Sequence, residues 1–250
     1  MDKSVQQSLL DRRSIRRYQY DAVSDSDMDF IYEAIRNTPT SYNGQQYSVI
    51  DIFDPELKMR LYEVTGQKQI KTCSHFMLFV ADFHKIEVAA KSKGIEHSDF
   101  VHTVDGYTVA VIDASLAMMS AITAAVSRGL GTCPVGYIRT ADPDKVAGLL
   151  SLPKGVFPVC GLAIGIPREM PDLKPKQPID LLIHRNQYRT DDLTDDLMAY
   201  DAAVCGYNAT RAGTPSSNDW TAHIMSYYRE GESYDTLAAA RRQSFLLADR

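Results

Sequence analysis

The spacing of hydrophobic residues divides the chain into helices and strands. Residues 47–53 alternate between apolar and polar as a half-buried strand does, and residues 76–81 form a continuous apolar run that predicts a buried central strand. A further strand is predicted at residues 157–166. Helices are predicted at residues 4–10, 25–37, 55–65, 86–93, 109–126 and 143–150, and again from about residue 192. Strands separated by helices around one long central helix predict an α+β fold in a single domain.

The longest apolar stretch, residues 109–126, resembles a membrane span in length but contains polar residues such as Asp113 and Ser120. Its large apolar residues recur at helical intervals: Val109, Ile112, Leu116, Met119, Ile122 and Val126. We therefore predict a buried core helix and no membrane partner. Asp113 stands among apolar neighbours, so we expect it to bind nearby backbone groups and not to act as a catalytic acid or base.

Composition narrows the class of protein. The chain has 250 residues, of which 44% are hydrophobic, and a net charge of −5, which argues against nucleic acid as the main partner. The four cysteines form no C-x-x-C pair and no zinc-like cluster with histidine, so no metal site is predicted. The first residues contain no apolar signal core, and we expect a cytoplasmic location with reduced thiols.

Two basic segments are candidates for binding an anion. Residues 12–17 read Arg-Arg-Ser-Ile-Arg-Arg, and guanidinium groups bind phosphate bidentately while the hydroxyl of Ser14 adds a donor. Lys174 and Lys176 lie on a proline-stiffened segment in which alternate side chains point the same way. The first run also fits the solvated basic end of a helix, and the second also fits a proline-rich surface connector.

Two loops carry groups that suit the edge of a heterocycle. Residues 38–46 are dense in hydroxyls and amides just before a strand, and Gln67 after Gly66 is a similar candidate. The polar composition that is common in surface loops would also explain residues 38–46 and Gln67.

The glycine-rich residues 129–136, a turn into a short strand, can place backbone groups beside a flat ligand. They do not match a dinucleotide fingerprint, because Pro134 stands where the third glycine belongs. They do not match a Walker A loop, because Gly136 is followed by Tyr137 and not by lysine. The sequence also lacks G-x-S-x-G and H-E-x-x-H, which argues against the usual hydrolytic sites.

Taken in order, these segments resemble the nitroreductase family, most closely its oxygen-insensitive NADPH nitroreductase and flavin reductase branch. The resemblance rests on Arg-Arg-Ser-Ile-Arg-Arg-Tyr, the hydroxyl-rich loop, Gly-Gln-Lys at residues 66–68, the glycine-rich turn and Pro-Asp-Leu-Lys-Pro-Lys near residue 174. It covers about residues 5–230 and implies a homodimer with two FMN molecules at the subunit interface. It also implies one nitroreductase-like domain over residues 1–250, with a mostly antiparallel central sheet flanked by helices. Roughly residues 190–250 would form a C-terminal helical excursion that wraps the partner.

The resemblance assigns FMN contacts position by position. The clamp on the ribityl phosphate would consist of Arg12, Arg13, Ser14, Lys174 and Lys176. The pyrimidine edge of the flavin would be contacted by Arg16 and Gln67. The loop beside the ring would contribute Thr40, Ser41 and Gln45, and the backbone run under the ring would be Pro134, Val135 and Gly136. Arg12 stands where close relatives often have histidine, and it still suits phosphate.

For the nucleotide co-substrate, Arg211 matches the first of two arginines that grip the 2′-phosphate of NADPH in the family. The second position falls within residues 216–219, which contain no basic residue, so the sequence leaves the choice between NADPH and NADH open.

The resemblance implies that FMN carries the chemistry at its N5 atom, in ping-pong hydride transfer from NAD(P)H to nitro-aromatic, quinone or flavin acceptors, with no catalytic protein residue. The alternatives are a dedicated flavin or metal-ion reductase, or a non-catalytic flavin-binding or redox-sensing protein.

Overall fold

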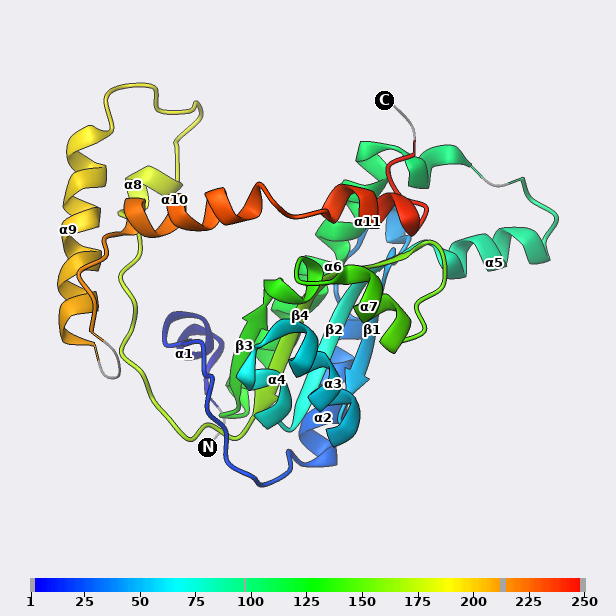
Figure 1. Ribbon diagram of the computed structural model, residues 1–250, viewed down its shortest axis with the longest axis horizontal. Helices are drawn as coiled ribbons and strands as arrows, with labels where there is room; N and C mark the ends of the chain where they lie inside the picture. Colours follow the sequence, from blue (N-terminus) through cyan, green and yellow to red (C-terminus); the bar gives the residue numbers. More distant parts are fainter. Residues whose placement is uncertain (1–2, 97, 212–214, 248–250) are drawn as a thin grey trace. The chain divides into compact units, whose positions relative to one another are not determined.

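The computed structural model describes residues 3–96, 98–211 and 215–247, which form two compact units. The first unit comprises Met1–Glu169 and Asp235–Arg250, and the second comprises Met170–Tyr234. The first contains a four-stranded antiparallel sheet in the order β1-β2-β4-β3 (Figure 1). Its strands are β1 (Tyr47–Ile52), β2 (His75–Asp82), β3 (Gly131–Val135) and β4 (Val156–Gly165). The predicted α+β fold with an antiparallel sheet between helices is therefore confirmed.

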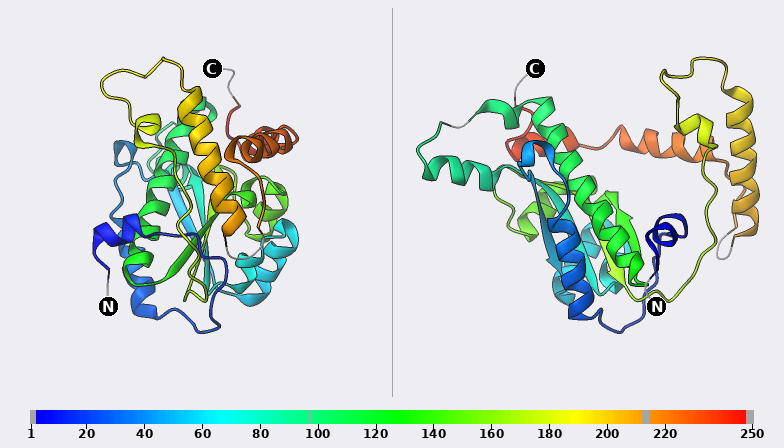
Figure 2. Two further views of the ribbon diagram at one scale, coloured as in Figure 1. Left: turned by 90° about the vertical axis from the view of Figure 1, so that its left-hand side faces the viewer. Right: turned by 180° about the vertical axis from the view of Figure 1, so that it is seen from behind.

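Helices cover both faces of this sheet. On one face lie α2 (Asp25–Arg36) and α6 (Val104–Ser127), which Figure 2 shows from behind. On the other face lie α3 (Pro55–Thr65), α4 (Lys68–Thr72) and α7 (Pro143–Leu149). The alternate residues of β2 divide between the two cores: Met77 and Phe79 face α6, whereas Phe76 and Leu78 pack in the other cluster. This two-sided burial explains the continuous apolar run that predicted a central strand.

The helix α6 presents alanines to the core and larger side chains to the surface. The alanines at 110, 114, 117, 121 and 125 are fully buried. Ile112, Leu116 and Met119 are 40–46% exposed. The prediction of a core helix is confirmed, and within one chain these three side chains lie on its outward side. Small side chains let the helix approach the sheet closely, and the larger ones then project outward. By length and composition α6 could also cross a membrane, yet 56% of its most apolar window is buried in the protein.

Local capping sets several helix ends. Ser24 accepts a hydrogen bond from the backbone of Asp27 at the start of α2, and Asp54 caps α3 with Pro55 in its first turn. The other predicted helices of the first unit correspond to α1 (Val5–Leu10) and α5 (His84–Ser92). Sequence periodicity did not predict the short elements α4, η1 (Ser41–Asn43), η2 (Asp99–His102) and η3 (Gly136–Arg139), nor α11 (Thr236–Arg242).

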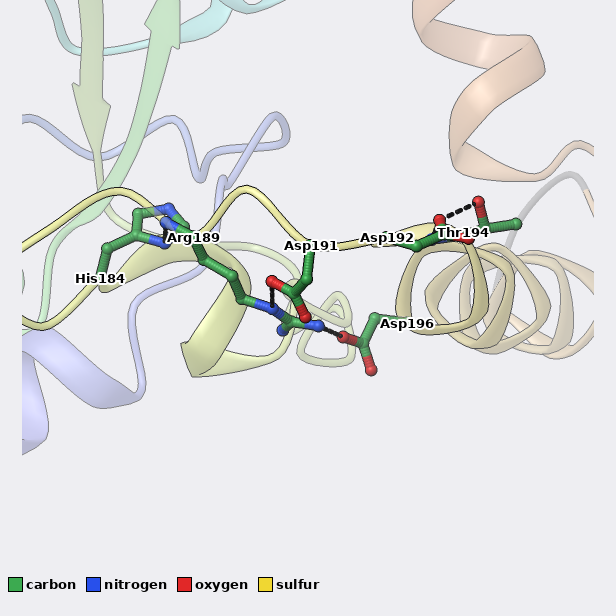
Figure 3. A network of polar contacts seen from close by, with 6 residues as sticks. All are labelled: His184, Arg189, Asp191, Asp192, Thr194 and Asp196. Carbon is green, nitrogen blue, oxygen red and sulfur yellow. Dashed lines mark hydrogen bonds and ion pairs between the residues drawn. The ribbon is translucent and has the colours of Figure 1, made fainter.

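The second unit consists of α8 (Ile179–Leu182), α9 (Thr194–Thr210), α10 (Trp220–Gly231) and irregular chain. Figure 3 shows how Arg189 ties the chain before α9 to its first turn, through Asp191 at 2.7 Å and Asp196 at 2.9 Å. Between α9 and α10, residues 212–214 lie outside the described residues.

The C-terminal helix α11 belongs to the first unit. The C-terminal excursion over roughly residues 190–250 stays a prediction. The single domain over residues 1–250 stays a prediction.

Candidate functional site

The arginine-rich segment is an extended strand-like run on the free edge of β3. The helix α1 ends at Leu10, so residues 12–17 are not the basic end of a helix. Ser14 forms a parallel bridge with Thr132 of β3, and the backbone N–H of Ile15 donates to the Thr132 carbonyl at 2.9 Å. The sheet thereby holds the segment in place along its edge strand.

Alternation along this run decides which side chains face outward. Ile15 is 4% exposed and packs on Gly131, where a Cβ atom would lie 2.9 Å from the Ile15 Cβ. A side chain at 131 would therefore push the segment away from β3. Arg12 is half-buried and Arg16 is exposed, so their guanidinium groups are accessible beside the strand.

Glu169, which sequence reasoning missed, anchors the end of the segment. Its Oε1 accepts a hydrogen bond from the backbone N–H of Arg16 at 2.9 Å, and its Oε2 lies 3.7 Å from Nε of Arg17. Within the described part of the chain, the side chains of Arg12 and Arg16 form no ion pair. The segment therefore keeps two uncompensated cationic groups.

Two buried polar atoms beside this segment have no hydrogen-bond partner among the described residues: Nε of Arg13 and Oγ1 of Thr132. The other end of Arg13 is held, because its Nη1 donates to the Asp11 carbonyl at 2.7 Å. Native proteins rarely bury unpaired donors, since each costs roughly 1–3 kcal/mol. A donor-rich, cationic surface of this kind fits an anionic, oxygen-rich group such as a phosphate ester.

The residues after Thr132 offer an open strand edge. Pro134 and Gly136 are exposed, whereas Val135 is 3% exposed and packs in the core. A Cβ atom built on Gly136 would meet nothing within 4 Å. Pro134 lacks an N–H group, so it cannot donate a hydrogen bond to a further strand on the outer side of β3. The run therefore leaves backbone surface free for a flat ligand.

Gln67 is the N-cap of helix α4, which packs in the same core as the arginine segment. Ile70 of α4 and Ile15 belong to one buried cluster. The backbone N–H of Gln67 donates to Thr65 Oγ1 at 3.3 Å, and its Oε1 accepts from Gln69 Nε2 at 2.9 Å. These contacts orient the Gln67 carboxamide.

The loop before β1 is fixed from within by Asp113, which is fully buried on α6. Asp113 Oδ1 accepts from the backbone N–H of Ser41 at 2.9 Å, and Oδ2 accepts from that of Gln46 at 3.1 Å. Gln45 N–H donates to Thr40 Oγ1 at 3.2 Å. The expectation that Asp113 binds neighbouring backbone is confirmed, and its effect is to hold the Thr40–Gln45 segment.

Within one chain, the strand register places this loop and the arginine segment at diagonally opposite corners of the sheet. Thr132 pairs with Ile164, which pairs with His75 at the start of β2, and the loop leads into Tyr47, which pairs with Ala81 at the end of β2. The two corners are separated by three strand spacings and most of a strand length. Spacings of about 4.8 Å between strands and about 3.3 Å per residue put them roughly 25 Å apart.

The remaining predicted residues belong to the second unit. Lys174 and Lys176 are exposed on an irregular segment that α9 supports: the hydroxyls of Tyr207 and Tyr200 donate to the carbonyls of Asp172 and Pro175 at 3.4 and 3.3 Å. Arg211 is the C-cap of α9. Their approach to the arginine segment stays a prediction.

Three of the four thiols are predicted to be unreactive in the folded protein. Burial raises the pKa of Cys73 to about 12 and also raises the pKa of Cys133 and Cys160; at Cys133 the charges of Arg16 and Arg12 oppose the rise. Because the thiolate is the reactive species, a raised pKa slows reaction at pH 8. We expect one fast thiol, Cys205, in a titration with a disulfide reagent. A fast phase that survives Cys205→Ser would contradict this.

Several known proteins are similar to this chain in sequence and fold. A model of the nitroreductase family matches residues 9–166, and a model of the C-terminal domain of the nitroreductase family matches residues 174–248. The chain is 37% identical over 226 residues to an FMN reductase (NAD(P)H) of Bacillus subtilis (strain 168), covering 90% of each chain. It is 34% identical over 219 residues to an oxygen-insensitive NADPH nitroreductase of Salmonella typhimurium, covering 86% of this chain and 87% of that one. A solved hypothetical oxidoreductase from Bacillus subtilis matches with a TM-score of 0.93 and 35% identity, covering 96% of this chain and 97% of that one.

Proposed function

This chain belongs to the nitroreductase family, and on that premise we propose that it is an FMN-dependent NAD(P)H oxidoreductase that reduces nitro-aromatic, quinone or flavin acceptors. The observation that carries the proposal is the cationic segment on the edge of β3 with its two buried, unpaired donors. When bound, FMN would supply the redox chemistry, which is two-electron transfer from NAD(P)H to the acceptor. The chain's own residues bind and orient the cofactor.

The phosphate end of FMN would be held by the arginine segment and the two lysines. Arg12, Arg13 and Ser14 offer two guanidinium groups and a hydroxyl beside Thr132. Lys174 and Lys176 would add two ammonium groups from the second unit. Charge-assisted hydrogen bonds of this kind are about twice as strong as neutral ones, so the clamp would dominate affinity for FMN.

The ring end would lie along β3. Pro134, Val135 and Gly136 would support the ring with backbone groups, and the Gln67 carboxamide would meet its pyrimidine edge. The exposed guanidinium of Arg16 would stabilise negative charge that develops on the ring when it is reduced. None of these groups needs to act as a nucleophile or base.

We also infer that the functional protein is a homodimer. If Thr40, Ser41 and Gln45 contact the same FMN as the arginine segment, the loop must come from a second copy, because within one chain the two lie at opposite corners of the sheet. The outward side of α6 offers an interface, because Leu116 and Met119 are exposed and line a cavity of 460 Å³ together with Phe30. Exposed apolar surface of this kind commonly marks a protein interface.

Placing a charge on this face is expected to separate the subunits. We expect Leu116→Glu to shift the protein from dimer to monomer in sedimentation velocity and to release FMN, because the composite site would be lost. Val88, which is 54% exposed on α5, provides a matched control in Val88→Glu. A Leu116→Glu protein that stays dimeric and yellow would refute this interface.

For the nucleotide, we propose that Arg211 contacts the 2′-phosphate of NADPH. Replacing Arg211 by alanine should raise KM for NADPH about ten-fold and leave KM for NADH nearly unchanged, since only NADPH carries that phosphate. Steady-state kinetics with both nucleotides measures this. Equal effects on the two KM values would remove the assignment.

Anaerobic addition of NADPH or NADH to the FMN-loaded protein tests catalysis itself. The visible absorbance of the flavin should bleach rapidly and return when a quinone or nitro-aromatic compound is added. A flavin that binds but does not bleach would identify a non-catalytic flavin protein.

We propose a cytoplasmic location, which the free thiols of all four cysteines support.

A further inference from the structure

The peptide unit that joins Ile15 to Arg16 is held at both of its polar groups. The Ile15 carbonyl accepts a hydrogen bond from the hydroxyl of Tyr18 at 2.6 Å. The Arg16 N–H donates to Oε1 of Glu169 at 2.9 Å. Because the carbonyl and the N–H of a trans peptide point in opposite directions, these two partners fix the plane of the peptide from both sides. That plane sets the direction in which the Arg16 side chain leaves the backbone.

Glu169 reaches this peptide from the chain that follows β4. Backbone hydrogen bonds of 2.9 and 3.0 Å join residues 17–19 to residues 166–168, which places Glu169 beside the arginine segment. Before Arg16, the segment pairs instead with Thr132 of β3. Arg16 therefore lies where the segment changes from one backbone partner to another, and a side chain supplies the acceptor for its N–H.

The bond to the Arg16 N–H is the main contact of the Glu169 carboxylate. Its other oxygen lies 3.7 Å from Nε of Arg17, whose side chain is exposed, and exposed ion pairs contribute little. A hydrogen bond from a backbone N–H to a carboxylate is stronger than one between neutral groups. Within the described part of the chain, Glu169 forms no ion pair with the Arg16 guanidinium. Glu169 thus fixes the backbone of Arg16 and leaves its charge for a ligand.

The same contacts also fit a purely structural tie between two segments of the chain. A structural tie would change the stability of the fold and leave the redox properties of a bound flavin unchanged. A positioning role would change those properties, and it would do so only while the Arg16 side chain is present. The two roles therefore differ in a measurable way.

We propose that Glu169 is a positioning residue that acts through Arg16: it holds the Arg16 N–H and so directs the guanidinium toward the flavin ring, where its charge favours the reduced cofactor. The inference rests on the proposed function, because it takes Arg16 to lie beside the ring of FMN. Glu169 itself needs no contact with the cofactor.

The midpoint potential of the bound flavin, measured anaerobically against a reference dye on the FMN-loaded full chain, tests the proposal. It reports how much more tightly the protein binds reduced FMN than oxidised FMN. We expect Arg16→Ala to lower this ratio about ten-fold, which is a fall of about 30 mV in a two-electron potential. Glu169→Ala should lower the ratio at least about three-fold.

The double variant decides whether Glu169 acts through Arg16. Adding Glu169→Ala to Arg16→Ala should lower the potential no further, because the group that Glu169 directs is already absent. Additive effects would overturn the proposal. So would a Glu169→Ala protein that has a lower Tm and an unchanged potential, since that result identifies a structural tie.

Two control variants separate the hydrogen bond from the charge. Glu169→Gln keeps an acceptor oxygen, so it should keep at least the ratio of the unaltered protein; a fall as large as that in Glu169→Ala would contradict the role of the hydrogen bond. Arg17→Ala removes the ion-pair partner of Glu169 and should leave the potential unchanged. Failure to bind FMN at all would reject the proposed function, whereas FMN binding with a potential that responds to Arg16→Ala and not to Glu169→Ala would reject only this inference.

Discussion

Replacing Arg12 or Lys174 by alanine is expected to weaken FMN binding about ten- to a hundred-fold. Each side chain would lose a charge-assisted contact with the phosphate, worth roughly 1.5–3 kcal/mol. Fluorescence titration of the flavin-free protein with FMN measures the effect directly, because flavin emission changes on binding. A loss in both variants would show that both residues contribute to binding of the same ligand.

Arg17 provides the matched control for this experiment. It lies in the same arginine run, but its Nε is paired with Glu169 at 3.7 Å and its side chain is 78% exposed. Arg17→Ala should therefore leave FMN affinity within about two-fold, since exposed ion pairs contribute little. Loss of FMN in Arg17→Ala to the same extent as in Arg12→Ala would indicate a general charge effect and would contradict the clamp.

Removing the carboxylate of Asp113 is expected to produce the largest loss of stability. Asp113→Ala would leave the buried N–H groups of Ser41 and Gln46 without their acceptor. Two charge-assisted hydrogen bonds contribute about 3–6 kcal/mol in total. For a chain of this size, that lowers Tm by about 10 °C in thermal unfolding. The loop carrying Thr40 and Gln45 would also loosen, so FMN affinity should fall.

Two comparison variants sharpen this prediction. Asp113→Asn keeps one acceptor oxygen, so its Tm should lie between those of Asp113→Ala and the unaltered protein. Asp105→Ala removes an exposed carboxylate from the first turn of the same helix and should change Tm by at most a few degrees. If Asp113→Ala melted like Asp105→Ala, the buried carboxylate would not hold the loop.

Sequence periodicity predicted most elements because each depends on local information. The run at residues 76–81 identified the strand at the centre of the sheet, and Pro55 marked the start of α3. The sequence did not decide the orientation of α6, because its alanines and its larger residues both recur at helical spacing. Only the packing against β2 and β4 decides that the alanines face inward and that Leu116 faces outward.

The pairing of strands that are distant in the sequence could not be predicted, and this limited the prediction of the site. The resemblance assigned both Ser14 and Thr40 to FMN contacts. The sequence did not show that, within one chain, they lie at opposite corners of the sheet. Glu169 gave no sequence signal, because its role depends on the backbone of Arg16, 153 residues away. Asp113 was interpreted correctly because a lone carboxylate in an apolar run must find donors nearby.

Comparing FMN with riboflavin tests the central claim most directly, because the two ligands share the ring and ribityl chain and differ in the phosphate. The flavin-free protein should bind FMN at least about a hundred-fold more tightly than riboflavin, since several charge-assisted contacts depend on that group. The ratio should fall toward one when Arg12 and Lys174 are both replaced by alanine. Equal affinity of the unaltered protein for FMN and riboflavin would mean that these cations do not gather around a phosphate.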